Sequence, residues 1–344
     1  EMGIRDSFGR VRNLTEQALQ TYLQSEDAQR TTQGTLVSEV TLAWLTLGAN
    51  REQLALQKET LASQEESFRL VGESYKYGAA SRLDYEQART TVASARAAIT
   101  TYVRAVAQSK NALELLVGSK VPDELQPSGV ELAATLPATL PAGLPSEVLL
   151  NRPDIISAER GMISANANIG AARAAFFPSI SLTANAGSAS AHLSDLFGAN
   201  TGLWSFTPSI SIPIFTGGRN LANLRSAEVQ EKIAVATYEK SIQTAFQEVA
   251  DALATEGTVE RELKERREFA DAASQAFELS SARYKHGAAA YTEVLDAKRT
   301  QVSAQQAVIT AELSRASSLV TLYKVLGGGT ELPEPAKTTE GAEK

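Results

Sequence analysis

The sequence contains no cysteine, which excludes disulfide bridges and thiolate metal sites. It contains no run of about 18 apolar residues, so it predicts no transmembrane helix. The only histidines, His192 and His286, lie far apart without an acidic cluster nearby, and we expect neither metal nor cofactor. No phosphate-binding motif or nucleophile–base arrangement occurs, so we expect no enzyme and no catalytic residue. The net charge of −7 argues against nucleic acid as a partner.

Proline is absent from residues 11–121 and from residues 214–332. Because proline is the strongest helix breaker, each of these stretches can hold very long helices. Aromatic residues make up only 6% of the chain and alanine is abundant, which favours long helices over a thick globular core.

The two proline-free stretches repeat each other at an offset of 209 residues. Gly9-Arg10 matches Gly218-Arg219, and Tyr75–Ala80 (YKYGAA) matches Tyr284–Ala289 (YKHGAA). A register kept without gaps over so many residues indicates an internal duplication.

Each copy predicts a helical hairpin, because apolar residues recur at heptad spacing as in a coiled-coil seam. The seams include Val37, Val40, Trp44, Leu47, Leu54 and Leu61 in the first copy, and Val235, Tyr238, Ile242, Phe246, Val249 and Leu253 in the second. The hairpins cover residues 11–119 and 216–329, and their turns lie near the glycines of residues 75–81 and 284–290. The first arm would be about 100 Å long at about 1.5 Å per residue.

Residues 178–215 predict two β-strands, because apolar residues and small hydroxyls alternate there with period two. One face carries Ile180, Leu182, Trp204, Phe206, Ile210, Ile212 and Ile214, and the other carries Ser181, Thr183, Ser209 and Ser211. Aromatic residues gather at the ends of the runs, as in the girdles of a transmembrane barrel. An amphipathic hairpin packed on a soluble core would show the same alternation.

Four segments carry a resemblance to a known family: Leu150–Ile155 (LNRPDI), Gly170–Pro178 (GAARAAFFP), Pro213–Gly218 (PIFTGG) and Gln243–Leu253 (QTAFQEVADAL). With the paired tips, they make the chain resemble the TolC/OprM-like outer-membrane channels of tripartite efflux pumps over residues 8 to 329. Arg152 and Asp154 flank a proline at a helix start, which by itself favours capping or a local ion pair.

The resemblance implies a mainly α fold with a small β part: a helical tunnel of coiled-coil hairpins and transmembrane strands. Three protomers would each give four strands to a twelve-stranded barrel. The channel would be a passive conduit for drugs and small toxic compounds. It would lie in the outer membrane of a Gram-negative bacterium, contact its lipid and extend into the periplasm. Its partners would be two further copies, a periplasmic adaptor and an inner-membrane resistance–nodulation–division pump.

We expect residues 1–10 to be a strand remnant of atypical sequence, 11–119 the first hairpin, and 120–177 an equatorial connector and helix. Residues 178–215 would form two transmembrane strands with an external loop. Residues 216–329 would form the second hairpin, and 330–344 a disordered tail. The family's signal peptide, lipidated cysteine, equatorial helix pair and first strand have no counterpart here. We therefore expect the chain to supply two full strands of four, too few to close its share of a barrel.

The resemblance also implies three sets of site residues. Those of the adaptor-docking tips are Tyr75, Gly78, Ala79, Ala80, Tyr284, Gly287, Ala288 and Ala289. Those of a periplasmic gate are Thr292, Glu293, Asp296, Tyr284 and Asp84. The apolar strand face named above would meet lipid. Ala289 stands where some relatives place a basic residue, so closure would depend on Tyr284 and hairpin packing.

Two other functions stay open at this point. One is an exit duct for type I protein secretion, which would share the same architecture. The other is a structural periplasmic coiled-coil protein or adaptor, in which the strands pack on helices. The aromatic-flanked apolar strand face argues against the second.

Overall fold

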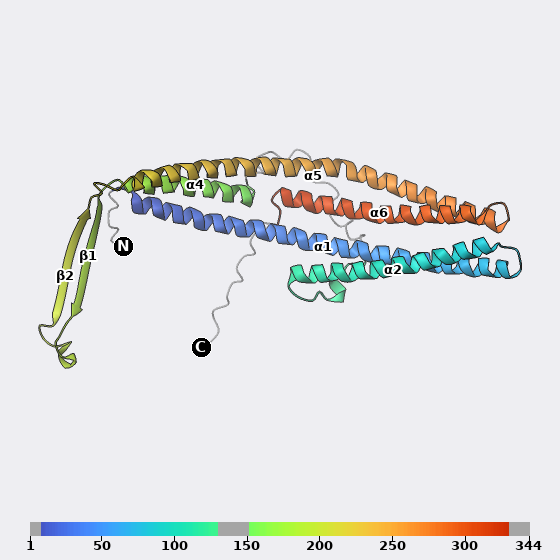
Figure 1. Cartoon of the computed structure of the whole chain (residues 1–344), viewed down its shortest axis with the longest axis horizontal. Helices are drawn as coiled ribbons and strands as arrows, with labels where there is room; N and C mark the ends of the chain where they lie inside the picture. Colours follow the sequence, from blue (N-terminus) through green and yellow to red (C-terminus); the bar gives the residue numbers. More distant parts are fainter. Residues whose placement is uncertain (1–7, 130–150, 330–344) are drawn as a thin grey trace, which may run out of the picture. The chain divides into compact units, whose positions relative to one another are not determined.

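The computed structural model of the chain describes residues 8–129 and 151–329. In that part, the chain forms long helices and one short strand pair, which lies between α4 and α5 in the sequence (Figure 1). The helices are α1 (Arg10–Lys76), α2 (Arg82–Val117), α4 (Pro153–Ala174), α5 (Arg219–Lys285) and α6 (Tyr291–Val325). The strands are β1 (Ser179–Ser188) and β2 (Gly202–Ser211), and short 3-10 turns occur at Asp123–Leu125 and Leu193–Asp195. Most of the expected strand remnant (1–7), part of the connector (130–150) and the expected disordered tail (330–344) lie outside the described residues.

The helix boundaries confirm the internal duplication. Helix α5 begins and ends at the residues that correspond to the two ends of α1 in the repeat, and α6 begins at the counterpart of the first residue of α2. Each hairpin turns at a glycine with a positive φ, +73° at Gly78 and +71° at Gly287. An added side chain at either glycine would meet nothing within 4 Å, so the backbone conformation alone requires glycine there.

The chain divides into two compact units, residues 1–29 with 153–243 and residues 30–152 with 244–344. In the first unit, α4 packs on the start of α1 through small and polar side chains. The hydroxyls of Thr21 and Ser164 lie 3.1 Å apart, and Ser157 donates to the carbonyl of Gln24 over 3.2 Å. Such short side chains let the two backbones approach closely.

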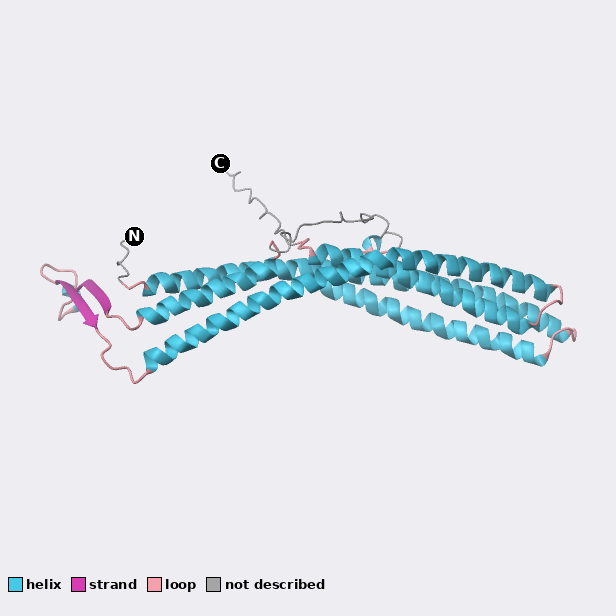
Figure 2. Ribbon diagram, turned by 90° about the horizontal axis from the view of Figure 1, so that it is seen from above, coloured by secondary structure: helices cyan, strands magenta, loops and turns pink. Residues whose placement is uncertain are grey.

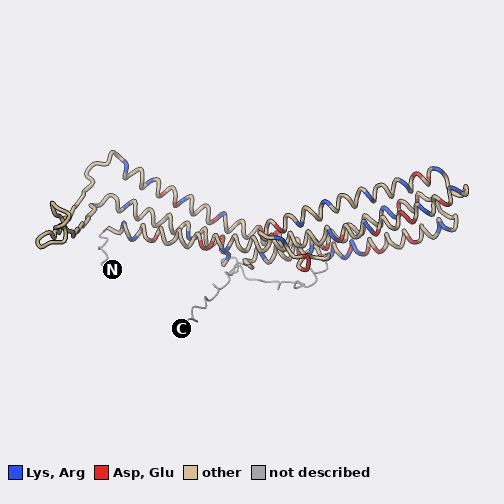
Figure 3. The backbone as a smooth tube through the Cα atoms, turned by 90° about the horizontal axis from the view of Figure 1, so that it is seen from below, with Lys and Arg blue, Asp and Glu red and all other residues tan. Residues whose placement is uncertain are grey.

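The strands of the first unit form an antiparallel pair in which Ile180 lies opposite Ile210 and Ser181 opposite Ser209. Since paired residues point to the same face, this register places the apolar side chains of both strands together. The strand pair carries no charged residue and is drawn in tan throughout in Figure 3.

Strand β2 ends at Ser211, short of the end that the alternation suggested. Ile212 and Ile214 therefore lie beyond the paired strand. Pro213, which has no N–H to donate to a ladder, lies between them and accounts for the early end.

In the second unit, α1, α2, α5 and α6 lie side by side (Figure 2). Small apolar clusters hold them together. One cluster joins α1 to α6 through Leu45, Ala49, Ile309, Ala316 and Val320. A second lies beside the turns and contains Val71, Ala88, Tyr291 and Val294.

The seam predicted for α5 is wrong at Phe246 and Leu253, whereas Val249 packs against a buried cluster as predicted. Phe246 and Leu253 are 49% and 52% exposed, whereas Ala245, Ala252 and Val259 are buried. A seam of alanines lets neighbouring helices approach more closely than phenylalanine or leucine would allow, so the larger side chains lie outside.

Gly170 of α4 allows the tightest approach in the first unit. A Cβ there would lie 2.4 Å from Oδ1 of Asn13, whose amide already donates to the carbonyl of Gly9 over 2.6 Å. We expect Gly170→Ala to lower the free energy of unfolding by about 1–3 kcal/mol, because Asn13 must move or lose that bond. Chemical denaturation followed by circular dichroism measures the change.

Gly257 of α5 is the matched control, because it is also helical but has nothing within 4 Å of an added Cβ. Gly257→Ala should be neutral or stabilising by up to about 1 kcal/mol, since alanine favours the helix. Equal effects of the two substitutions would contradict the steric role of Gly170.

Candidate functional site

The two hairpin turns contain most of the residues that the sequence singled out. At the first turn, Ser81 caps α2 in a capping box. The Ser81 Oγ accepts from the amide of Asp84 at 3.1 Å, and Oδ2 of Asp84 accepts from the amide and hydroxyl of Ser81 at 3.1 and 2.7 Å. This reciprocal arrangement fixes the Asp84 carboxylate at the start of α2.

Asp84 lies close to two tyrosines of the second hairpin. The rings of Tyr284 and Tyr291 are 5.2 Å apart, and Tyr291 is only 4% exposed. Burial raises the pKa of Tyr291 to about 12, with smaller contributions from Tyr284 and the Asp84 charge. Burial, and then the Asp84 charge, also raises the pKa of Tyr284. Both phenols are therefore protonated at neutral pH and available as donors. This cluster contains residues of both hairpins.

The acidic residues after the second turn have basic neighbours in the same chain. Glu293 pairs with Arg283 at 3.3 Å, and Asp296 pairs with Arg299 at 2.8 Å. Arg299 is one helical turn from Asp296 and could have been found from spacing. Arg283 lies ten residues from Glu293, on the other side of the turn, and spacing along a single helix does not predict this pair. Thr292, Glu293 and Asp296 are all exposed in the single chain.

Between the hairpins lies a cavity of about 660 Å³, lined mainly by amides and hydroxyls of α1, α2 and α6. Within the described ranges, three buried amide atoms on its wall have no hydrogen-bond partner: Gln57 Nε2, Gln64 Oε1 and Gln87 Oε1. Each such group costs about 1–3 kcal/mol when left unpaired away from water. The hairpins are therefore joined less firmly here than at the apolar Leu45 cluster.

A lysine on the same cavity wall is held by an aromatic ring. The Lys298 Nζ lies 4.6 Å from the centroid of Phe277 and donates to Oε1 of Gln301 over 3.1 Å. Burial lowers the pKa of Lys298, while the charge of Glu59 opposes that shift. These contacts stabilise the ammonium group, which would otherwise be costly to bury.

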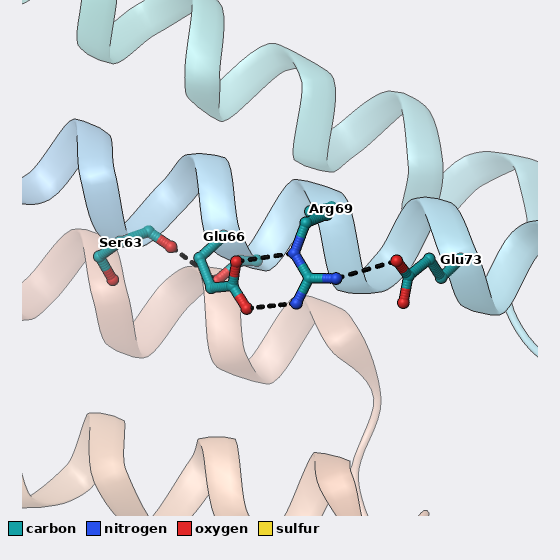
Figure 4. Close-up of polar contacts among 5 residues, drawn as sticks. Ser63, Glu66, Arg69 and Glu73 are labelled. Atoms are coloured by element: carbon teal, nitrogen blue, oxygen red, sulfur yellow. Dashed lines mark hydrogen bonds and ion pairs between the residues drawn. The ribbon is translucent and has the colours of Figure 1, made fainter.

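An exposed arginine fork marks the α1 face near the first turn (Figure 4). Arg69 donates to both carboxylate oxygens of Glu66, at 2.8 and 2.6 Å, and to Glu73 at 2.9 Å. The bond from Arg69 lowers the pKa of Glu66. All three residues lie on one helix, so the fork orders a solvated face and joins no second element.

Arg152 has long-range partners that the sequence did not reveal. Its guanidinium is buried and donates to the carbonyl of Val325 at 2.9 Å and to Oε2 of Glu248 at 2.7 Å. The pairing with Glu248 is thus long-range. Arg152 of the LNRPDI segment is thereby bonded to Glu248 of the QTAFQEVADAL segment. It also satisfies the last carbonyl of α6. The Asp154 carboxylate does act locally, accepting from the amide of Ile155 at 3.0 Å.

The apolar face of the strand pair is a second candidate surface. Its side chains are largely uncovered, with exposed fractions of 64% for Ile210 and 81% for Trp204. Elsewhere, the described residues contain no group of three or more His, Asp or Glu side chains that could hold a metal ion. No helix among them combines the length and apolarity needed to cross a membrane.

Comparison with known proteins identifies relatives over almost the whole chain. Residues 6–119 and 144–328 match the family described as outer membrane efflux protein. The solvent efflux pump outer membrane protein SrpC of Pseudomonas putida is 49% identical over 324 residues, which are 94% of this chain and 69% of that protein. Outer membrane protein OprJ of Pseudomonas aeruginosa is 45% identical, with 94% and 68% covered.

Solved structures agree with the sequence comparison. The open state of the Neisseria gonorrhoeae MtrE outer membrane channel has a TM-score of 0.82 and 39% identity, covering 95% of this chain and 73% of that one. A membrane protein from Pseudomonas aeruginosa has a TM-score of 0.85 and 44% identity, covering 94% and 72%.

Proposed function

The chain belongs to the outer membrane efflux protein family, and we propose that it forms the outer-membrane exit channel of a tripartite efflux system. The observation that carries this proposal is the match of the chain, hairpins and strands together, to outer membrane components of efflux pumps. The relatives' names refer to solvent, toluene and antibiotic efflux, so small toxic organic compounds are the proposed cargo. The channel conducts them passively toward the outside.

The proposed assembly is a trimer of the full-length protein, in which three copies complete one barrel and one helical tunnel. Two outward side chains of α5 support it: Phe246 and Leu253, which are two helical turns apart on one face, are each about half exposed in the single chain. Large apolar side chains left exposed on one face of a helix are typical of an interface. Phe246 and Leu253 each lie one position after a buried alanine, so they point away from the helices of their own chain, where a neighbouring copy can contact them.

In this proposal the strand pair crosses the outer membrane. Ile180, Leu182, Trp204, Phe206 and Ile210 meet lipid, and the serine-rich face meets the water-filled lumen. The absence of charge from both strands supports this placement. It disfavours a structural coiled-coil protein, which would cover or charge such a face.

The two turns, in the same proposal, dock the hairpin ends of a periplasmic adaptor that links the channel to an inner-membrane pump. Ala79 and Ala288 are exposed beside the turn glycines, so a partner can approach the backbone closely. The duplicated small residues of both turns suit such an approach.

The cluster of Asp84, Tyr284 and Tyr291 belongs to the proposed gate. Asp84 of the first hairpin and Tyr284 of the second hold the closed mouth, and opening separates them. In a trimer, Thr292, Glu293 and Asp296 would each be repeated three times around this mouth, together with the paired Arg283 and Arg299, so its conductance would depend on charge.

The lipid-facing assignment is tested with Ile210→Arg. We expect it to reduce the yield of SDS-resistant trimer from outer-membrane fractions, because arginine near the bilayer midplane costs about 2–4 kcal/mol. Ser209→Arg, on the opposite face of the same strand, should reduce the yield much less. Equal losses would show that Ile210 does not face lipid.

Adaptor docking is tested by enlarging the turns. Ala79→Trp combined with Ala288→Trp should abolish drug resistance while trimers remain in the membrane, because the added rings keep the partner away. The size-matched controls Ala79→Ser and Ala288→Ser should retain resistance. Normal resistance with both turns blocked would refute docking at this place.

The gate is tested by removing one hydroxyl. Tyr284→Phe should raise single-channel conductance in planar bilayers, because it deletes the hydroxyl that we propose bonds Asp84 in the closed mouth and leaves the capping box intact. Tyr75→Phe is the matched control, since Tyr75 occupies the same position in the first copy and stacks on Tyr85 with rings 5.4 Å apart. If both variants conduct like the wild type, Tyr284 does not hold the mouth.

A further inference from the structure

The two hairpin turns are copies in sequence but are closed by different interactions. Ser81 caps α2, and its counterpart in the second copy is Ala290, which makes no side-chain cap at the start of α6. The backbone is nearly the same at both positions, with φ and ψ of −76° and 158° at Ser81 and −77° and 151° at Ala290. The first turn of a helix leaves backbone amides without internal partners, so α6 lacks a stabilising contact that α2 has.

The third residue of both helices is acidic, but its partner differs. Asp84 of α2 is held by Ser81, its own capping residue. Glu293 of α6 is held by Arg283, which reaches across the turn from the end of α5 with its Nη1 3.3 Å from Oε2 of Glu293. The other terminal nitrogen of Arg283 donates to the carbonyl of Ala288, inside the turn, at 3.1 Å.

We propose that Arg283 is a positioning residue that replaces the missing cap and holds the second turn closed by charge. Its guanidinium joins three parts of the turn: the end of α5, the loop carbonyl of Ala288 and the start of α6. In the first copy the matching residue is Ser74, which carries no charge. The first turn is thus closed by short bonds within one helix start and the second by an ionic bridge between two helices.

The exposure of the bridge has a consequence for its strength. Arg283 and Glu293 side chains are 59% and 48% exposed, so dissolved salt screens their attraction. The Ser81–Asp84 box consists of short contacts that salt weakens less. We therefore expect the second turn to open more readily as ionic strength rises, and the first turn to respond little.

Amide hydrogen exchange of the full-length trimer without partners measures turn opening directly. Arg283→Ala should speed exchange of residues 286–293 by about fivefold, the loss expected for a helix cap. The added change Ala290→Ser should restore slow exchange, because Ser-Tyr-Thr-Glu then forms the capping box that the first copy uses. Ser74→Ala, at the position that matches Arg283, should leave the first turn unchanged, and Ser81→Ala should open it.

Measuring exchange at low and high sodium chloride distinguishes an ionic bridge that holds the turn closed from an ion pair that has no effect on it. In the wild type, rising salt should speed exchange at the second turn, and the Arg283→Ala variant should lose this dependence. Unchanged exchange in Arg283→Ala, or failure of Ala290→Ser to restore it, would overturn the proposal. Because exchange needs no transport, this result is independent of whether the chain acts in efflux.

Discussion

Close approach of long helices along seams of small residues is the constraint on which the second unit depends. Ala88, Ala245 and Ala316 are completely buried, and Ala304 is 1% exposed. The unit has no thick core, so its cohesion comes from many short contacts along the helices. The same constraint explains why aromatic residues are scarce and why Phe246 and Leu253 lie outside the seam.

The strength of the contact between the hairpins varies along their length. At Leu45 the contact is apolar and well packed, and beside the turns Val71, Tyr291 and Val294 form a second apolar contact. Between them the contact is polar, with amides of Gln57, Gln64 and Gln87 unpaired among the described residues. Buried groups that lack partners favour separation over tight packing. The polar section around Gln57, Gln64 and Gln87 is thus the part of the contact that separates at least cost.

Because the hairpin occurs twice in this chain, the backbone and the side chains of its two turns can be compared directly. Both copies keep the glycine turn and the acid at the third helical position, and the helix boundaries keep the register of the repeat. The partners of that acid have diverged, a serine cap in one copy and a cross-turn arginine in the other. The backbone conformation has therefore been kept while the interaction that stabilises it has been exchanged.

The sequence by itself determined the duplication, the turns at Gly78 and Gly287, and the alternation of β1 and β2. These features are local: proline-free length, a glycine that permits positive φ, and period-two patterning are read within a few residues. The tertiary structure decided which phase of α5 is buried, because heptad spacing fits a leucine seam and an adjacent alanine seam equally well. It also decided that Arg152 meets Glu248, 96 positions away, and that Arg283 donates to the carbonyl of Ala288 within the second turn. Such partners depend on how separate helices pack, and spacing along one helix carries no record of that.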